Sequence, residues 1–545
     1  MNDFILACEN SNESRALEIL ELDKEHKIVY GYINKKKYTP LLLACKNKLE
    51  KVALKLLERP ELCNINAYVG DYCDALQFAY ENELQDVVIK INNIKESSGI
   101  DIHCFRSKWE NSAFMEACYH GLEKVAKKLL ETPEKCNVGY INEAYNDNAF
   151  MLACRNYKLI DIANRLLVEY PKECNIGQIG VGETALIFAC KNELESVALK
   201  ILDNWEECKI GHVSKSYDVK LQEYYKENGT ALMYACMYGL ETVALKILEH
   251  PKECNMGYNS EDCNTALIYA CENGLETVAL KILEYPDECN IGYVGRNGIS
   301  TFMCSCIHNL ENVALKFLEC NETIDINIGN ISNNGYTALM FACMYDLETV
   351  ALKILDYGEK CKISHYEKAK GYTALMFACI HNLENVVYKI LENSKECNIE
   401  HVSQINYIYY FHDSGYFSVN YNIEIKYGYT ALMFACSLNN ENIALKILEY
   451  SNESNIGRHY LIAKPKKYKL SYTFLEDTHT IGHSGNTALM IACENNLENV
   501  ALKILEYGTK CNIKHINTDG NTALKYAHKN KMEKVIAKIL EYSSV

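Results

Sequence analysis

The stretch from Gly335 to Leu355 reads GYTALMFACMYDLETVALKIL and joins two helical patterns. Residues 337–343 are apolar at nearly every position, which predicts a short helix enclosed by other helices. After a polar link at 344–346, residues 347–355 alternate between apolar and polar types as a half-buried helix does. Thr337 stands where its hydroxyl can cap the first helix. The stretch therefore predicts a helix–turn–helix unit.

This unit recurs along the whole chain, mostly at steps of 35 to 38 residues, with three longer steps. A fixed period of this length is typical of a solenoid, in which each copy buries its apolar faces against its neighbours. We therefore predict an all-α solenoid that forms a single array over residues 1–545 rather than several globular domains. The 14 residues equivalent to Thr337, here called markers, are Asn2, Thr39, Asp74, Ser112, Asn148, Thr184, Thr230, Thr265, Ser300, Thr337, Thr373, Thr430, Thr487 and Thr522.

The segments between the helix pairs are predicted to be extended fingers. They typically read Cys-Asn-Ile-Gly-Tyr and end in Gly-x-Thr, and a β-branched residue followed by a glycine turn favours a short hairpin. Three fingers carry insertions, at 209–228, 401–428 and 458–484. The second has aromatic and β-branched runs on both sides of Asp413-Ser414-Gly415, which predicts a projecting β-hairpin. Such insertions either belong to a binding face or are neutral loop expansions.

The two ends of the chain have the pattern of terminal repeats. The first copy, 1–36, begins almost directly in its first helix, and the last, 520–545, carries Lys525 and His528 where internal copies have apolar residues and cysteine. Polar substitutions on a face without a further neighbour are expected of a capping repeat. We expect no further domain after Val545.

These motifs resemble those of the ankyrin repeat family. The family's opening Gly-x-Thr-Pro-Leu-x-x-Ala-Ala is matched by Thr39-Pro40-Leu41-Leu42-Leu43-Ala44-Cys45, and its Leu-Glu-x-Val segment by Leu240-Glu241-Thr242-Val243. The proline is mostly alanine here, the histidine is methionine or another apolar residue, and the second alanine is cysteine. The composition, rich in Tyr, Cys and Asn, is similar to that of the expanded ankyrin families of giant DNA viruses. The resemblance implies helix pairs with β-hairpin fingers and a role in binding proteins.

Composition and charge exclude several functional classes. The formal net charge of −16 opposes nucleic-acid binding, which needs a positive surface. The sequence has neither a signal peptide nor an apolar run long enough to span a membrane. The 26 cysteines are therefore predicted to be free thiols in a reducing compartment, and the viral resemblance implies the host cytoplasm. We expect a monomer without a cofactor.

Cysteine and histidine patterns raise the question of a metal site. Twelve cysteines share one position in the first helix, where a small hydrophobic residue packs well between close helices. Zinc binding is the alternative for the Cys-x-x-x-His pairs, but adjacent repeats stand about 10 Å apart, too far to share one ion easily. No catalytic motif is present, so we expect no enzyme. The four pairs are Cys208/His212, Cys361/His365, Cys397/His401 and Cys511/His515.

A partner surface is predicted in the middle repeats. The resemblance implies that contacts come from finger residues before the marker and from the two residues after the first helix, along a concave face. The latter are polar in early and late copies but aromatic or apolar in most middle copies, and tyrosines precede three successive markers there. Such a patch usually marks an interaction site, although packing between fingers is the alternative. The candidate residues are Tyr238, His308, Tyr336, Tyr345, Tyr372, His381 and Tyr429.

The leading hypothesis is a non-enzymatic scaffold that binds a protein. The alternative is a substrate-recruiting adaptor for a host ubiquitin ligase, as some viral ankyrin proteins are. Those adaptors carry a C-terminal recruiting motif, and the last copy here has the pattern of a capping repeat instead. A metal-binding protein built on the Cys-x-x-x-His pairs is the third hypothesis.

Overall fold

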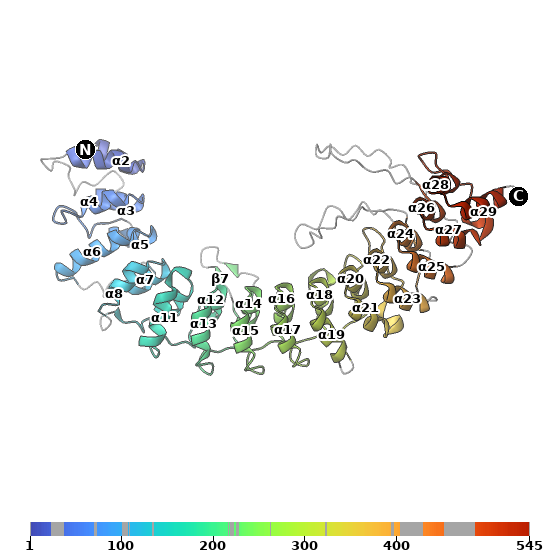
Figure 1. Ribbon diagram of the computed structural model, residues 1–545. Helices are drawn as coiled ribbons and strands as arrows, with labels where there is room; N and C mark the ends of the chain where they lie inside the picture. The colour runs from blue at the N-terminus through green and yellow to red at the C-terminus, as the bar shows by residue number, and fades with distance from the viewer. Residues whose placement is uncertain are drawn as a thin grey trace. The chain divides into compact units, whose positions relative to one another are not determined.

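The computed structural model describes residues 2–22, 38–69, 73–100, 107, 109–132, 136–215, 217–218, 223–224, 228–261, 263–321, 324–393, 397–399, 401–403, 429–451 and 485–543. The chain divides into two compact units, Met1–Cys289 and Asn290–Val545. Within each unit, pairs of helices follow one another side by side (Figure 1).

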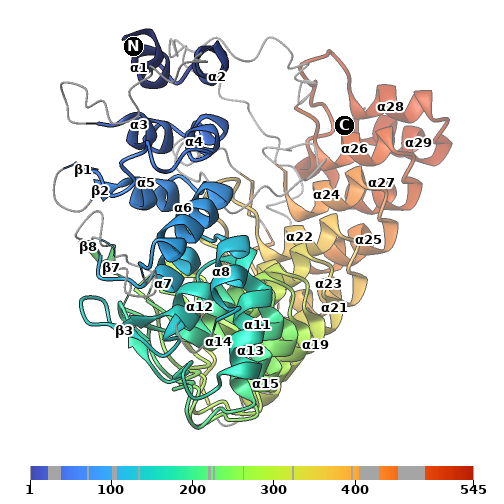
Figure 2. The ribbon, with the colours of Figure 1, turned by 90° about the vertical axis from the view of Figure 1, so that its left-hand side faces the viewer.

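The first unit contains eight helix pairs among its described residues. The first helices are α1 (Asn2–Glu9), α3 (Pro40–Lys46), α5 (Ala75–Glu81), α7 (Ala113–Tyr119), α10 (Ala149–Cys154), α12 (Ala185–Lys191), α14 (Ala231–Met237) and α16 (Ala266–Glu272). The second helices are α2 (Glu13–Leu22), α4 (Glu50–Leu56), α6 (Gln85–Ser97), α8 (Glu123–Leu129), η2 (Tyr157–Leu159) with α11 (Ile160–Glu169), α13 (Glu195–Leu202), α15 (Glu241–Ile247) and α17 (Glu276–Ile282). Figure 2 shows the two helices of the α3–α4 pair lying next to each other.

The second unit contains six pairs in its described part. Its first helices are α18 (Thr301–Ile307), α20 (Ala338–Met344), α22 (Ala374–Ile380), α24 (Ala431–Ser437), α26 (Ala488–Glu494) and α28 (Ala523–Lys529). The second helices are α19 (Glu311–Cys320), α21 (Glu348–Leu355), α23 (Glu384–Glu392), α25 (Glu441–Tyr450), α27 (Glu498–Leu505) and α29 (Glu533–Ser543). Short 3-10 turns are η3 (Arg296–Gly298), η4 (Gly358–Cys361) and η6 (Gly508–Cys511).

The markers cap the first helices, as predicted. Thr337 adopts an extended conformation, and its side chain accepts a hydrogen bond from the N–H of Met340 at 3.3 Å. A cap of this kind stabilises a protein by about 1 kcal/mol. The remaining markers that cap in the same way are Thr39, Asp74, Ser112, Asn148, Thr184, Thr230, Thr265, Ser300, Thr373, Thr430, Thr487 and Thr522.

A left-handed residue makes the tight turn between the two helices of a pair. Asp346 has a φ of 63°. The N–H of Leu347 then bonds to the carbonyl of Ala342 at 2.9 Å, a pattern that closes a helix end before the chain reverses. Asparagine and glycine fill this position in several other copies because they tolerate that conformation most readily.

The core lies between and within the pairs. Every side chain of α20 is buried, which confirms the prediction of an enclosed helix. In α21, Val350, Ala351, Ile354 and Leu355 are buried, which confirms the predicted half-buried pattern.

The fingers are built from short antiparallel pairings. Among the described residues, four two-stranded hairpins lie in the first unit, and the second unit has isolated bridges such as Ile331 with Thr337 and Tyr366 with Thr373. The paired strands are β1 (Tyr68–Val69) with β2 (Cys73–Asp74), β3 (Ile141–Asn142) with β4 (Asp147–Asn148), β5 (Ile179–Gly180) with β6 (Glu183–Thr184), and β7 (Tyr217–Asp218) with β8 (Glu223–Tyr224).

The predicted insertions and ends are only partly described. The insertion 209–228 contains the β7–β8 hairpin. Most of the insertion 401–428, including the predicted β-hairpin, and nearly all of 458–484 lie outside the described residues. In the last copy, Lys525 and His528 are exposed on α28, and the capping role of this copy stays a prediction.

Candidate functional site

Positions within a repeat are counted here from the marker, so that +8 is the residue directly after the first helix and −1 is the residue before the marker. At +8, asparagine joins neighbouring repeats. The side-chain amide of Asn82 donates to the carbonyl of Cys45 at 2.9 Å, and that of Asn530 donates to the carbonyl of Cys493 at 2.7 Å. The same bond is made by Asn47, Asn192, Asn273 and Asn495. Asparagine at +8 therefore has a structural role, which the sequence analysis missed because the acceptors are backbone carbonyls.

Four successive repeats of the second unit lack this asparagine. His308, Tyr345, His381 and Leu438 occupy +8 at the ends of α18, α20, α22 and α24, and these helices contact one another in sequence. His308 and Leu438 are exposed, Leu438 at 44 %, while Tyr345 and His381 are half-buried. We call these four residues the central row. Tyr238 holds the same position in the first unit and is 39 % exposed.

The tyrosines at −1 pack against aromatic residues instead of projecting from the fingers. Tyr372 is only 4 % exposed and makes edge contacts with Phe377 and Phe434, with ring centroids 5.5 and 5.4 Å apart. The expectation that Tyr372 is an accessible contact residue is therefore wrong, because the phenylalanines at +4 of its own and the next repeat enclose its ring.

Tyr336 and Tyr429 are half-buried members of the same aromatic stack. Tyr336 lies nearly parallel to Phe341, with centroids 5.0 Å apart, and 6.4 Å from Phe377. Tyr429 lies 5.2 Å from Phe434. The packing alternative thus accounts for much of their surface, and only part of each ring remains accessible to a partner.

Charged residues occupy the equivalent places in part of the first unit. Asp147 at −1 pairs with Arg155 at +7, with oxygen–nitrogen distances of 2.8 and 3.0 Å. The Arg155 guanidinium lies 4.2 Å from the ring centroid of Phe188 in the next repeat. Burial raises the pKa of Asp147, and the charge of Arg155 opposes that shift. This ion pair connects the finger to the first helix, as the aromatic stack does in the second unit.

One residue of the central row has an unusual partner on its own helix. His308 is hydrogen-bonded to the thiol group of Cys304, one turn earlier on α18, and this bond raises the pKa of His308 although partial burial acts to lower it. Cys304 replaces the aromatic residue that most repeats carry at +4.

The cysteines of the first helices are buried packing residues. Cys190 and Cys236 are fully enclosed, and burial raises the pKa of the Cys190 thiol to about 12. Because the thiolate is the reactive form, such thiols are unreactive at neutral pH. Of the 24 cysteines whose side chains the structure describes, Cys263 is exposed and the others are buried.

Two histidines of the Cys-x-x-x-His pairs, His212 and His515, reach back to the preceding finger. One ring nitrogen of His212 lies 3.0 Å from the carbonyl oxygen of Gly182, and the same nitrogen of His515 lies 2.8 Å from that of Gly485. Both glycines precede a marker by two residues. This bond between fingers gives His212 and His515 a structural role, whereas the equivalent Nε2 atoms of His365 and His401 are buried without such a bond.

The described residues contain neither a metal-binding cluster nor a membrane-spanning helix. No group of three or more His, Cys, Asp or Glu side chains in these ranges is arranged to hold a metal ion. Nor does any helix in them combine the length and the apolar character that crossing a bilayer requires.

Models of the ankyrin repeat match three stretches of this chain. A model of three ankyrin repeats matches residues 114–214 and 302–403, and a model of a single ankyrin repeat matches residues 484–517. The crystal structure of the human ASB11 ankyrin repeat domain is 18 % identical, and the match covers 51 % of this chain and 98 % of that domain with a TM-score of 0.31. A search of the curated proteins finds no match.

The fold and the family models together define an ankyrin-type repeat solenoid. Ankyrin repeats indicate a scaffold for protein–protein interaction, and the matching models describe repeats rather than a catalytic domain.

Proposed function

We propose that this chain is a non-enzymatic scaffold that binds a protein partner through the central row of its second unit, with Tyr238 contributing in the first unit. The half-buried tyrosines Tyr336 and Tyr429 would lie at the edge of the contact surface. The buried Tyr372 would stabilise the fingers that carry this surface by packing against Phe377 and Phe434. The partner is a protein, since the net charge of −16 disfavours nucleic acid.

One observation carries the proposal. Most other repeats use +8 for an asparagine that bonds to the preceding repeat, whereas four adjacent repeats place histidine, tyrosine or leucine there. These repeats present large side chains at +8 instead, and in the repeat of Leu438 the bond to the preceding repeat comes from Asn440, whose side-chain amide donates to the carbonyl of Cys379 at 3.1 Å. Tyrosine and large apolar side chains supply contact area with few rotatable bonds, which suits the centre of a protein interface.

Charge is distributed in a way that agrees with this surface. The second helices α19, α21, α23 and α25 each begin with glutamate and carry a second carboxylate in their last turn or directly after it. The central row itself contains no lysine, arginine, aspartate or glutamate, and exposed charges of these repeats outside the second helices include Arg296 and Lys368 on fingers and Asp346 in a turn. Charged residues are depleted from interface cores, so the row is better suited to contact than the second helices are.

We further propose an intracellular site of action and a single monomeric array over residues 1–545. Most of the described cysteines serve as buried packing residues, which fits a reducing compartment. The same cap, turn and second helix recur in both units, which fits one array built from one repeat.

Replacement of Tyr345 by serine tests the proposal. We expect recovery of the partner from cell extract to fall about tenfold, as for an interface tyrosine that contributes about 1.4 kcal/mol. The unfolding free energy should change by less than about 1 kcal/mol. Two control variants are measured in parallel. Tyr157→Ser, at a residue 70 % exposed in the first unit, should change neither partner recovery nor unfolding free energy. Tyr372→Ser, at a buried residue, should lower the unfolding free energy by about 3 kcal/mol. A Tyr345 variant that loses stability and capture together would favour packing over binding.

A further inference from the structure

Positive charge gathers on the fingers of the central-row repeats. The finger segments 292–299, 329–336 and 365–372 contain the cationic residues Arg296, Lys368 and Lys370. Their one acidic residue, Glu367, is completely buried, and its oxygen atoms accept hydrogen bonds from backbone N–H groups of its own finger. These fingers therefore present cations in a chain whose net charge is −16.

Lys370 is connected to the central row through aromatic contacts. Its ammonium lies 5.9 Å from the ring centroid of Tyr372, and that ring lies 5.5 Å from Phe377. Phe377 precedes His381 by one helical turn, and the N–H of His381 donates to its carbonyl at 3.0 Å. The cation and the row thus belong to one continuous stretch of a single repeat.

Lys368 connects this repeat with the preceding one. Its ammonium donates a hydrogen bond to the carbonyl of Asn333 at 2.8 Å. The finger of Asn333 ends in Tyr336, which stacks on Phe341 with ring centroids 5.0 Å apart. Phe341 precedes Tyr345 by one helical turn, and the N–H of Tyr345 donates to its carbonyl at 3.0 Å. Both lysines therefore lie on the finger side of the two middle residues of the central row.

Neither lysine forms an ion pair with an aspartate or glutamate within the described ranges. The first unit uses its cations differently. Arg155 pairs with Asp147 at 2.8 Å, and Lys191 pairs with Glu183, so that each cation at +7 is neutralised by a carboxylate at −1 of its own repeat. In the two middle repeats of the central row, −1 is tyrosine, which supplies no negative charge.

Carboxylates of the central-row repeats lie at the other end of the first helices. Asp346 is in the turn after α20, and Glu348 begins α21, where it accepts a hydrogen bond from the side-chain amide of Asn385 at 3.0 Å. An anionic ligand on the row is therefore attracted toward the fingers and repelled from the turns.

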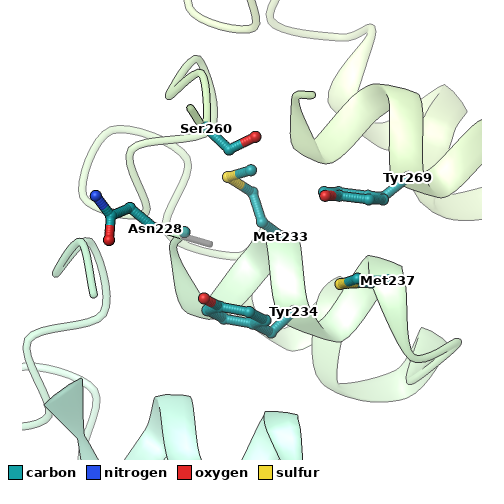
Figure 3. A pocket seen from close by; sticks show the side chains of 7 residues that line it. Asn228, Met233, Tyr234, Met237, Ser260 and Tyr269 are labelled. Carbon is teal, nitrogen blue, oxygen red and sulfur yellow. The ribbon is translucent and has the colours of Figure 1, made fainter. Parts of the chain in front are cut away.

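A small cavity in the first unit is too small to hold such a ligand. It lies next to Gly229, Met233, Tyr234 and Tyr269, and Figure 3 shows the side chains that line it. Its volume is about 30 Å³, which is room for water rather than for a side chain. The charged fingers of the second unit are thus the stronger indication of what this chain binds.

We propose that the partner contacts the central row with an acidic segment, whose apolar side chains cover Tyr345 and His381 while its carboxylates pair with Lys368 and Lys370. The inference rests on the proposed function, because it assigns a chemistry to the segment that the row binds. Charged pairs at the edge of an apolar contact accelerate association and select the partner, and the lysines stand at that edge.

Synthetic peptides test the charge of the segment. One peptide repeats the triplet Glu-Glu-Leu, and its two matches repeat Lys-Lys-Leu and Ser-Ser-Leu. In an extended, polyproline-like chain, successive leucines lie about 9 Å apart on one side, close to the spacing of about 10 Å between packed helices. By fluorescence anisotropy with the full chain, we expect the glutamate peptide to bind about tenfold more tightly than the lysine peptide, and the serine peptide to bind with intermediate affinity. Added salt should reduce these differences.

A charge reversal on the fingers tests the position of the carboxylates. In Lys368→Glu with Lys370→Glu, the affinity for the glutamate peptide should fall about tenfold, because like-charge contacts replace two ion pairs. The control Lys172→Glu with Lys252→Glu changes the net charge equally at exposed lysines of the first unit, and affinity should stay within about twofold. Melting curves of both variants show whether they fold, and the comparison of the three peptides in the natural chain does not depend on either variant.

Four results would overturn the proposal. The glutamate peptide fails to bind at millimolar concentration, the three peptides bind equally, or the two charge reversals weaken binding to the same extent. In the fourth, a single-stranded oligonucleotide binds through Lys368 and Lys370 whereas the glutamate peptide is unaffected by their reversal, which would assign the two lysines to phosphate.

Tyr345→Ser separates this proposal from the proposed function. We expect it to weaken the glutamate and serine peptides alike, since both place leucines on the row. If Tyr345→Ser weakens binding and the reversal of Lys368 and Lys370 does not, the row remains the contact surface and the acidic segment is refuted. If the reversal weakens binding and Tyr345→Ser does not, the lysines bind carboxylates away from the row, and the proposed function is refuted.

Discussion

At the scale of single residues, the residue type at +8 distinguishes repeats with a structural asparagine from repeats that we propose contact a partner. An asparagine there connects a repeat to its predecessor, as Asn82 does with the carbonyls of Cys45 and Lys46 at 2.9 and 3.2 Å. We propose that a tyrosine or histidine at the same place presents its side chain to a partner instead. The sequence shows that the residue type changes, but the reason for the asparagine becomes visible only with the neighbouring carbonyl in place.

Asn82→Ala tests the structural half of this distinction. Loss of the two side-chain hydrogen bonds should lower the unfolding free energy by about 1–2 kcal/mol, measured by urea denaturation. Asn204→Ala is the control, because Asn204 is exposed after α13, and its removal should cost less than about 0.5 kcal/mol. Equal effects of the two substitutions would show that the bond at +8 contributes nothing.

His308 offers a second test at this scale. Its bond to Cys304 raises the pKa above the ordinary value of about 6.5, so NMR titration should find a higher pKa in the natural chain than in Cys304→Ala. Because the native pKa is the higher one, the contribution of the pair to stability is complete below about pH 6.5 and is lost as the pH rises through the native pKa. A histidine pKa that does not fall in Cys304→Ala would contradict the pairing.

At the scale of elements, buried polar side chains fix the fingers. Glu367 is completely buried, and its carboxylate accepts hydrogen bonds from the N–H groups of Ala369, Lys370 and Tyr372 at 2.7, 2.6 and 3.1 Å. Burial raises the pKa of this carboxyl, and the three backbone donors oppose the shift. Ser332 and Asn517 make similar bonds in other fingers.

Glu367→Ala should therefore loosen one finger. The three N–H groups would lose their acceptor, at a cost of about 1–3 kcal/mol in unfolding free energy. Hydrogen exchange at the amides of Lys370 and Tyr372 should become faster, while Glu359→Ala, at an exposed residue, should leave both quantities unchanged. Unchanged exchange at these two amides in Glu367→Ala would contradict this explanation of the finger.

The helices were more predictable from the sequence than the candidate site was. Their caps, buried faces and turns depend on neighbours a few residues away, so the pattern around Thr337 was sufficient to predict them. The environment of Tyr372 depends instead on Phe434, which belongs to the next repeat after a long insertion. For the same reason, the hydrogen bond from His212 to Gly182 and the cavity at Gly229 could not be inferred from residue types alone.

At the scale of the whole molecule, one repeat geometry supports different surfaces. The first unit uses ion pairs between −1 and +7, whereas the second uses an aromatic stack between −1 and +4 together with the large side chains of the central row. The insertion 401–428 enters the chain between the repeats of His381 and Leu438, so it adjoins the central row in the sequence. Its contribution to binding stays a prediction.

The most direct test of the proposed function replaces two residues of the central row by asparagine, the residue type that bonds to the preceding repeat at +8. In Tyr345→Asn with His381→Asn, the new amides stand where they can bond to the carbonyls of Cys306 and Cys343, as asparagine does in other repeats. We predict an unfolding free energy equal to or above that of the natural chain, together with an at least tenfold loss of partner in quantitative affinity purification. Partner recovery that is unchanged in a folded double variant would contradict the account.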